Sequence, residues 1–185
     1  KAFAHMDPPT PWITWATSLW NARLNQNLLH SATAPFAIKA EDKVINWLAP
    51  LYGMDGGHMC SGSTIANLTA LWTARDTRGI QKVIASEATH ISVAKASRIL
   101  GLPYEQVAVN PKGQIDPDKI GDISNACLVL TAGTTATGVI DSLTLAGQAK
   151  WTHVDAAWAG PLRLSSTHAH LLDGIDKADS IAERI

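Results

Sequence analysis

One stretch of the sequence, Cys127-Leu128-Val129-Leu130-Thr131, is apolar without the alternation that a half-exposed strand shows. A second stretch of this kind runs from Trp151 to Ala157, and Val83–Ala85 and Val107–Val109 are shorter candidates. Strands that are apolar on both sides are typical of parallel sheets whose two faces are covered. These stretches therefore predict the buried strands of a mainly parallel sheet.

Helical patterns separate the predicted strands. Apolar residues recur with helical spacing over Ile65–Asp76 and over Ile91–Leu100, which stops at Gly101, a suitable C-terminal cap. Because strands and helices alternate, the predicted fold class is α/β, with a mainly parallel sheet flanked by helices. Only ten residues, Ser142–Trp151, lead into the last long strand, so one covering helix is expected to be trimmed there.

The N-terminal part of the chain has a different pattern. Closely spaced prolines exclude regular structure from His5 to Pro11. Trp12, Trp15, Leu19 and Trp20 recur with helical spacing, and a second helical pattern covers Ala40–Leu51. We therefore expect residues 1–52 to form a helical segment and loop, and residues 53–185 to form the domain with the sheet.

Composition limits the classes of function. The chain has 185 residues, 46% of them hydrophobic, and a net charge of -1, which does not suggest a nucleic-acid or anionic-membrane partner. No apolar window is long enough for a transmembrane helix, and no signal peptide is visible. Cys60 and Cys127 lie far apart without metal-type spacing, as expected of a cytoplasmic protein in a reducing compartment.

A glycine and hydroxyl turn, Cys60-Ser61-Gly62-Ser63-Thr64, runs directly into the helix predicted at Ile65. Free backbone amides at a helix N-terminus, together with the Ser63 and Thr64 hydroxyls, make a candidate phosphate site. Serine and threonine are also ordinary N-caps, so this reading stays open. The turn lacks the Gly-Lys-Ser/Thr ending of a P-loop.

Three further features follow predicted strands. His90 comes after the Val83 strand, and a threonine and glycine loop, Thr131–Thr135, ends the Cys127 strand. In His153-Val154-Asp155-Ala156-Ala157, strand alternation places His153, Asp155 and Ala157 on one face. A carboxylate inside an apolar strand is unfavourable without a partner, such as backbone amides, a buried arginine or a protonated pyridine nitrogen.

A phosphate site, a flat residue and a buried carboxylate together are what pyridoxal phosphate requires. The sequence resembles the group II pyridoxal-phosphate-dependent decarboxylases, which include the glutamate, aromatic-amino-acid and diaminobutyrate decarboxylases. The resemblance covers nearly the whole chain. It is carried, in order, by His5–Pro9, Ser61–Leu71 with Ala74-Arg75, Thr89–Ala96, Thr131–Thr135, His153–Gly160 and Ala178–Ala182.

The resemblance implies part of the large domain of a fold-type I, aspartate-aminotransferase-like enzyme that decarboxylates an L-amino acid as a homodimer. Its cofactor would be pyridoxal 5'-phosphate. Ser63 and Thr64 would bind the phosphate, and His90 would stack on the ring. Asp155 would pair with the ring nitrogen, and His90 and Asp155 would be the catalytic residues. Thr135 and Ala157 would contact the cofactor.

The same resemblance places the Schiff-base lysine just after Ile185, so the chain as given is expected to be inactive. The chain as given is also expected to lack the C-terminal domain of the family. It also makes Glu183 an unexpected residue for a buried strand.

Three other readings stay open. An aminotransferase or a carbon-sulfur lyase of the same fold would use the same cofactor site. A non-catalytic remnant is compatible with the missing lysine. A zinc hydrolase could use His90, His153 and Asp155, but the sequence has no His-Glu-x-x-His spacing.

Overall fold

The computed structural model describes residues 10–184, so the predictions for His5–Pro9 and for Ile185 lie outside the described residues. The chain divides into two compact units between Leu48 and Ala49. The first contains helices α1 (Trp12–Leu24) and α2 (Pro35–Leu48). α2 begins earlier than the sequence pattern indicated, because a proline is favourable in the first helical turn.

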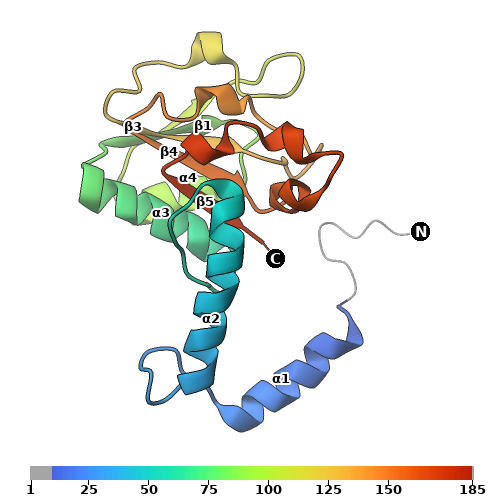
Figure 1. Cartoon of the computed structure of the whole chain (residues 1–185). Coiled ribbons are helices and arrows are strands. Elements are labelled where there is room, and N and C mark those ends of the chain that lie inside the picture. The colour runs from blue at the N-terminus through green and yellow to red at the C-terminus, as the bar shows by residue number, and fades with distance from the viewer. Residues whose placement is uncertain (1–9, 185) are drawn as a thin grey trace. The chain divides into compact units, whose positions relative to one another are not determined.

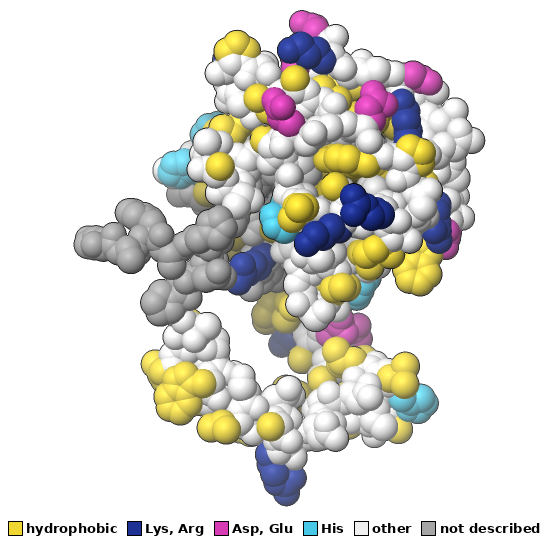
Figure 2. All heavy atoms as spheres, turned by 180° about the vertical axis from the view of Figure 1, so that it is seen from behind, with side chains coloured by type: hydrophobic (Ala, Val, Ile, Leu, Met, Phe, Trp, Pro, Cys, Tyr) yellow, Lys and Arg dark blue, Asp and Glu magenta, His cyan; other side chains and the backbone are white. Residues whose placement is uncertain are grey.

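The tryptophans of α1 are exposed. Trp12, Trp15 and Trp20 keep 68%, 60% and 68% of their surface, and no residue of α1 is buried. Figure 2 shows hydrophobic side chains on the outside of this helix. No helix among residues 10–184 is long and apolar enough to cross a membrane.

The second unit is built on a five-stranded sheet in which every pair of neighbours is parallel, in the order β2-β1-β3-β4-β5 (Figure 1). All residues of β3 and β4 are buried. The predicted parallel sheet is therefore confirmed. Its strands are β1 (Lys82–Ser86), β2 (Tyr104–Val107), β3 (Ala126–Thr131), β4 (Trp151–Ala156) and β5 (Ser180–Glu183).

One face of the sheet is covered by helices α3 (Ser63–Arg78) and α4 (Ile91–Ile99), as Figure 1 shows. Leu71 and Ala74 of α3 and Val93 and Ala96 of α4 pack on side chains of β1 and β3. Both helices present apolar residues to the strands, which is the pattern that predicted them, although Trp72 of α3 and Ile91 of α4 are exposed.

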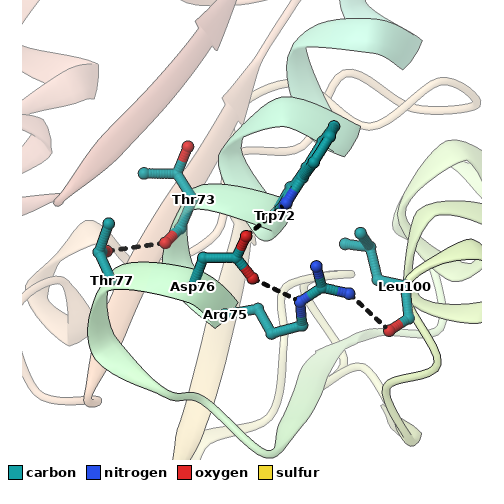
Figure 3. A network of polar contacts seen from close by, with 6 residues as sticks. All are labelled: Trp72, Thr73, Arg75, Asp76, Thr77 and Leu100. Carbon is teal, nitrogen blue, oxygen red and sulfur yellow. Dashed lines mark hydrogen bonds and ion pairs between the residues drawn. The ribbon is translucent and has the colours of Figure 1, made fainter.

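A polar network joins α3 to the end of α4 (Figure 3). Asp76 accepts hydrogen bonds from Trp72 Nε1 (2.6 Å) and from Arg75 Nε (2.8 Å). Arg75 also donates from Nη1 to the carbonyl oxygen of Leu100 (3.1 Å). The hydrogen bond from Arg75 lowers the pKa of Asp76. The guanidinium group thus connects α3 to the residue that follows α4.

The opposite face has no α-helix among the described residues of the second unit. Leu128 and Leu130 of β3 and Val154 of β4 pack there against Leu143 and Leu172, which lie on short 3₁₀ turns. The connection from β3 to β4 contains only the turn Leu143–Leu145. The connection comprises residues 132–150, which exceeds the roughly ten to twelve residues that a helical crossover needs, so its length alone does not account for the missing helix. The turns of the unit are Ala49–Tyr52, Pro117–Lys119, Leu143–Leu145, Gly160–Leu164, Ala169–Leu172 and Ile175–Lys177.

The position of one strand differs from the sequence predictions. The strand expected over Val107–Val109 is instead β2, which pairs with β1 and ends where β1 ends, with Ser86 opposite Val107. Beyond that point β1 offers no partner, and Val109 forms an isolated antiparallel bridge with Ile115.

Glu183, the unexpected residue, lies in β5 and accepts a hydrogen bond from the hydroxyl of Tyr52. Burial raises the pKa of the Glu183 carboxyl, and the bond from Tyr52 partly offsets this. A polar partner therefore explains how a carboxyl is tolerated in this strand.

Candidate active site at the carboxyl ends of the strands

Asp155 lies near the carboxyl end of β4 and is only 5% exposed. Its Oδ2 accepts a hydrogen bond from Asn67 Nδ2 (2.8 Å), and its Oδ1 accepts one from the backbone N–H of Ala157 (3.2 Å). None of the ion pairs among residues 10–184 includes Asp155. A buried carboxylate with few donors and no cationic side chain has room for one more donor, which fits a protonated ring nitrogen.

Asn67 of α3 is the centre of the site, and the sequence patterns did not single it out. It is wholly buried, and its Nδ2 donates to Asp155 Oδ2 and to Ser92 Oγ (2.9 Å). Its Oδ1 lies 3.0 Å from His153 Nε2. One signal was available, since Asn67 lies on the same helical face as the buried Leu71, and a polar side chain on that face requires partners.

His90 is the N-cap of α4, and its Nδ1 accepts a hydrogen bond from the backbone N–H of Ser92 (3.3 Å). His90 is exposed to solvent. Ser92 and Asn67 link this ring to Asp155 through three hydrogen bonds of 2.8, 2.9 and 2.8 Å. The His90 Nδ1 and Asp155 Oδ2 atoms therefore lie no more than about 9 Å apart.

Ser63 and Thr64 are the first two residues of α3. The preceding Gly62 has a φ of 139°, which favours glycine, and no side chain caps the helix. The first N–H groups of α3 thus remain open to an anion, and the helix dipole favours a negative charge there. Asn67 follows Thr64 within one helical turn, so the start of α3 lies close along the helix to the side chain that bonds Asp155.

Thr135 lies in the loop after β3, apart from the hydrogen bonds around Asn67. It lines a cavity of about 340 Å³ together with Thr134, Trp158 and Leu162. None of Ser63, Thr64, His90 or Asp155 lines that cavity. The structure thus links His90 and Asp155 through hydrogen bonds, while the phosphate contacts of Ser63 and Thr64 and a contact of Thr135 with the cofactor stay predictions. Ala157 is partly buried and meets Asp155 through its backbone N–H.

His153 precedes Asp155 by two residues in β4 and is wholly buried. Its Nδ1 lies 2.9 Å from Ser180 Oγ, and its Nε2 is engaged by Asn67. Burial lowers the pKa of His153. Both ring nitrogens are used inside the protein, so His153 does not offer a metal ligand. Among residues 10–184 no group of three or more His, Cys, Asp or Glu side chains is arranged to hold a metal ion.

The end of β3 is held by a second carboxylate that the sequence patterns did not single out. Asp141 is 2% exposed, and it accepts hydrogen bonds from the backbone N–H groups of Ile115 (2.6 Å) and Thr131 (2.8 Å). Thr131 stands opposite Asp155 in the ladder of β3 and β4, and its hydroxyl lies 3.1 Å from that of Thr89. Asp141 therefore supports the strand that lies beside Asp155.

Comparisons with known proteins identify relatives of this chain. Aspartate 1-decarboxylase from Aliivibrio fischeri is 34% identical over 96% of this chain and 43% of its own length. L-2,4-diaminobutyrate decarboxylase from Acinetobacter baumannii is 30% identical over 97% of this chain and 44% of its own length. The chain thus spans less than half the length of these curated relatives.

A solved structure has the same fold. It is the glutamate decarboxylase domain of diaminobutyrate-pyruvate transaminase and L-2,4-diaminobutyrate decarboxylase from Vibrio parahaemolyticus. It superposes with a TM-score of 0.83 at 30% identity, over 96% of this chain and 46% of that one.

The parallel sheet is that of fold-type I pyridoxal-phosphate enzymes. The family model of the pyridoxal-dependent decarboxylase conserved domain matches residues 1–184, and the chain belongs to this family.

Proposed function

We propose that the protein containing this chain decarboxylates an L-amino acid with pyridoxal 5'-phosphate. The observation that carries the proposal is the buried Asp155 carboxylate, which lacks a cationic side-chain partner among residues 10–184 and lies close to the His90 ring. Family membership favours decarboxylation over the transamination or carbon-sulfur cleavage that the same fold supports elsewhere. The relatives are named for several amino acids, so the proposal stops at the substrate class.

Each residue would have a distinct role in this reaction. When bound, the cofactor supplies an electron sink that lets the carboxylate of the substrate leave as carbon dioxide. Asp155 holds the proton on the ring nitrogen, and His90 stacks on the ring and orients it. Ser63, Thr64 and the open N–H groups of α3 bind the phosphate. Thr135 and Ala157 contact the cofactor from the ends of β3 and β4.

We also propose that residues 53–185 form part of the cofactor-binding domain of a cytoplasmic homodimer. The free thiols of Cys60 and Cys127 support a reducing compartment. The exposed Trp12, Trp15 and Trp20 support an interface with a second copy. Light scattering of the full-length protein tests the dimer, and a monomer at micromolar concentration would contradict it.

Binding of 4'-deoxypyridoxine 5'-phosphate tests the cofactor site directly. This analogue keeps the ring nitrogen and the phosphate but lacks the aldehyde, so it does not react with surface lysines. We expect the purified chain to bind it and His90→Ala to weaken binding about fivefold, because stacking on an aromatic ring contributes about 1 kcal/mol. Isothermal titration calorimetry measures both affinities.

The matched control is His170→Ala, which removes an exposed histidine from a turn in the connection between β4 and β5. It should bind the analogue as the unmodified chain does. Equal affinity of the His90→Ala variant would remove the stacking role, and a chain that does not bind the analogue at all would contradict the proposed function.

A further inference from the structure

A chain of hydrogen bonds runs from the interior of the sheet to the Asp155 carboxylate. The indole Nε1 of Trp151 donates to Ser180 Oγ (2.9 Å), which lies 2.9 Å from Nδ1 of His153. On the other side of the ring, Nε2 of His153 lies 3.0 Å from Oδ1 of Asn67. Nδ2 of Asn67 then lies 2.8 Å from Oδ2 of Asp155.

The carboxylate end of this chain fixes the direction of the bonds at Asn67, and a neutral imidazole ring fixes the bond between His153 and Ser180. An indole N–H can only donate, and an ionised carboxylate can only accept. Asn67 must therefore present its nitrogen to Asp155 and its oxygen to His153. It follows that Nε2 of His153 carries the proton, and that Nδ1 accepts from the hydroxyl of Ser180. Burial lowers the pKa of His153, which agrees with a neutral ring that carries one proton.

The same amide reaches the second functional side chain. The other hydrogen of Asn67 Nδ2 is donated to Ser92 Oγ (2.9 Å), which lies 2.8 Å from Nδ1 of His90. Asn67 and His153 are both wholly buried, so neither has water as an alternative partner on the surface. One amide group thus holds the Asp155 carboxylate and, through Ser92, the His90 ring.

We infer that Asn67 and His153 are positioning residues, which set the orientation of the Asp155 carboxylate and the His90 ring toward the cofactor. Oδ2 of Asp155 accepts from Asn67 and Oδ1 accepts from the N–H of Ala157 at 3.2 Å, so each oxygen keeps a second acceptor site for the ring nitrogen. The identity of the cofactor rests on the proposed function, whereas the hydrogen-bond chain does not depend on it.

The first test needs no ligand. Nitrogen-15 NMR of the imidazole groups, recorded on the purified chain at pH 7, distinguishes the two neutral tautomers and the charged ring. Comparison with His153→Gln assigns the signals. We expect His153 to be the tautomer with the proton on Nε2. A proton on Nδ1, or a charged ring, would overturn the direction of the chain and with it the inference.

The second test uses 4'-deoxypyridoxine 5'-phosphate labelled with nitrogen-15 in the ring. His153→Gln retains an N–H group that can donate to Asn67, whereas His153→Leu keeps the bulk and removes the donor. The ring-nitrogen signal should show the protonated form in the unmodified chain and in His153→Gln, and should move toward the unprotonated form in His153→Leu.

The two tests separate the possible failures. If the analogue binds and both variants leave the ring-nitrogen signal unchanged, the positioning role is wrong. If the unmodified chain does not bind the analogue, the proposed function fails and the positioning role fails with it. The tautomer measurement then still tells whether the hydrogen-bond chain itself is correct.

Discussion

Asp155→Asn should lower the rate of decarboxylation by the full-length protein by about a thousandfold. The change keeps the shape of the side chain and removes its charge. A pair of charges about 4 Å apart at an effective dielectric constant near 20 interacts by about 4 kcal/mol. Each 1.4 kcal/mol, roughly, corresponds to a factor of ten in rate, so the loss amounts to about three powers of ten.

The cofactor itself should remain bound in this variant. Ser63, Thr64 and the open N–H groups of α3 are unchanged, so the phosphate keeps its contacts. Measuring carbon dioxide release together with the absorption of the bound cofactor separates a slow enzyme from one that has lost its cofactor. A variant that retained cofactor and nearly the original turnover would show that Asp155 has a structural role only.

Asp179→Asn is the matched control for this experiment. Asp179 accepts a hydrogen bond from the backbone N–H of Thr152 (2.8 Å), at the amino end of β4 and therefore at the opposite edge of the sheet from the site. The same chemical change at this position should leave the rate within about threefold of the original, because a surface substitution away from the site has a small effect.

Much of the fold could be predicted because β3 is apolar along nearly its whole length and β4 lacks the regular alternation of a half-exposed strand. β3 and β4 were located this way. The layer opposite α3 and α4 could not be predicted, since its residues lie on short 3₁₀ turns that give no periodic pattern. β2 was misplaced for a different reason. Val107 and Val109 have strand propensity, but the ladder ends where β1 ends, and only the three-dimensional partner determines that.

Some residues of the candidate site could be predicted from the sequence, and others could not. Asp155 and His90 could be proposed as site residues because Asp155 is a carboxylate inside a predicted strand and His90 follows one. Asn67 could not be assigned a role, because its three partners come from α4 and β4, far apart in the sequence. A buried polar residue derives its function from groups that only the fold brings together.

Asp141→Ala should have the largest effect on stability. Asp141 accepts hydrogen bonds from the backbone N–H groups of Ile115 and Thr131, and all three residues are buried. Removing the carboxylate leaves two buried donors without an acceptor, each at a cost of about 1 to 3 kcal/mol. We therefore expect the free energy of unfolding to fall by about 3 kcal/mol, with a melting temperature lower by roughly 6 to 12 °C.

Denaturant unfolding followed by circular dichroism measures this change, and Asp122→Ala is its control. Asp122 also accepts from a backbone N–H group, that of Ser124 (2.9 Å), but it is exposed, so water replaces the carboxylate and the midpoint should not move. Equal midpoints for the two variants would show that Asp141 does not hold β3. If only Asp141→Ala lowers stability, this variant should also bind the analogue more weakly. Thr131 and Asp155 face each other in the ladder, so the Asp155 carboxylate keeps its position only while the end of β3 stays in place.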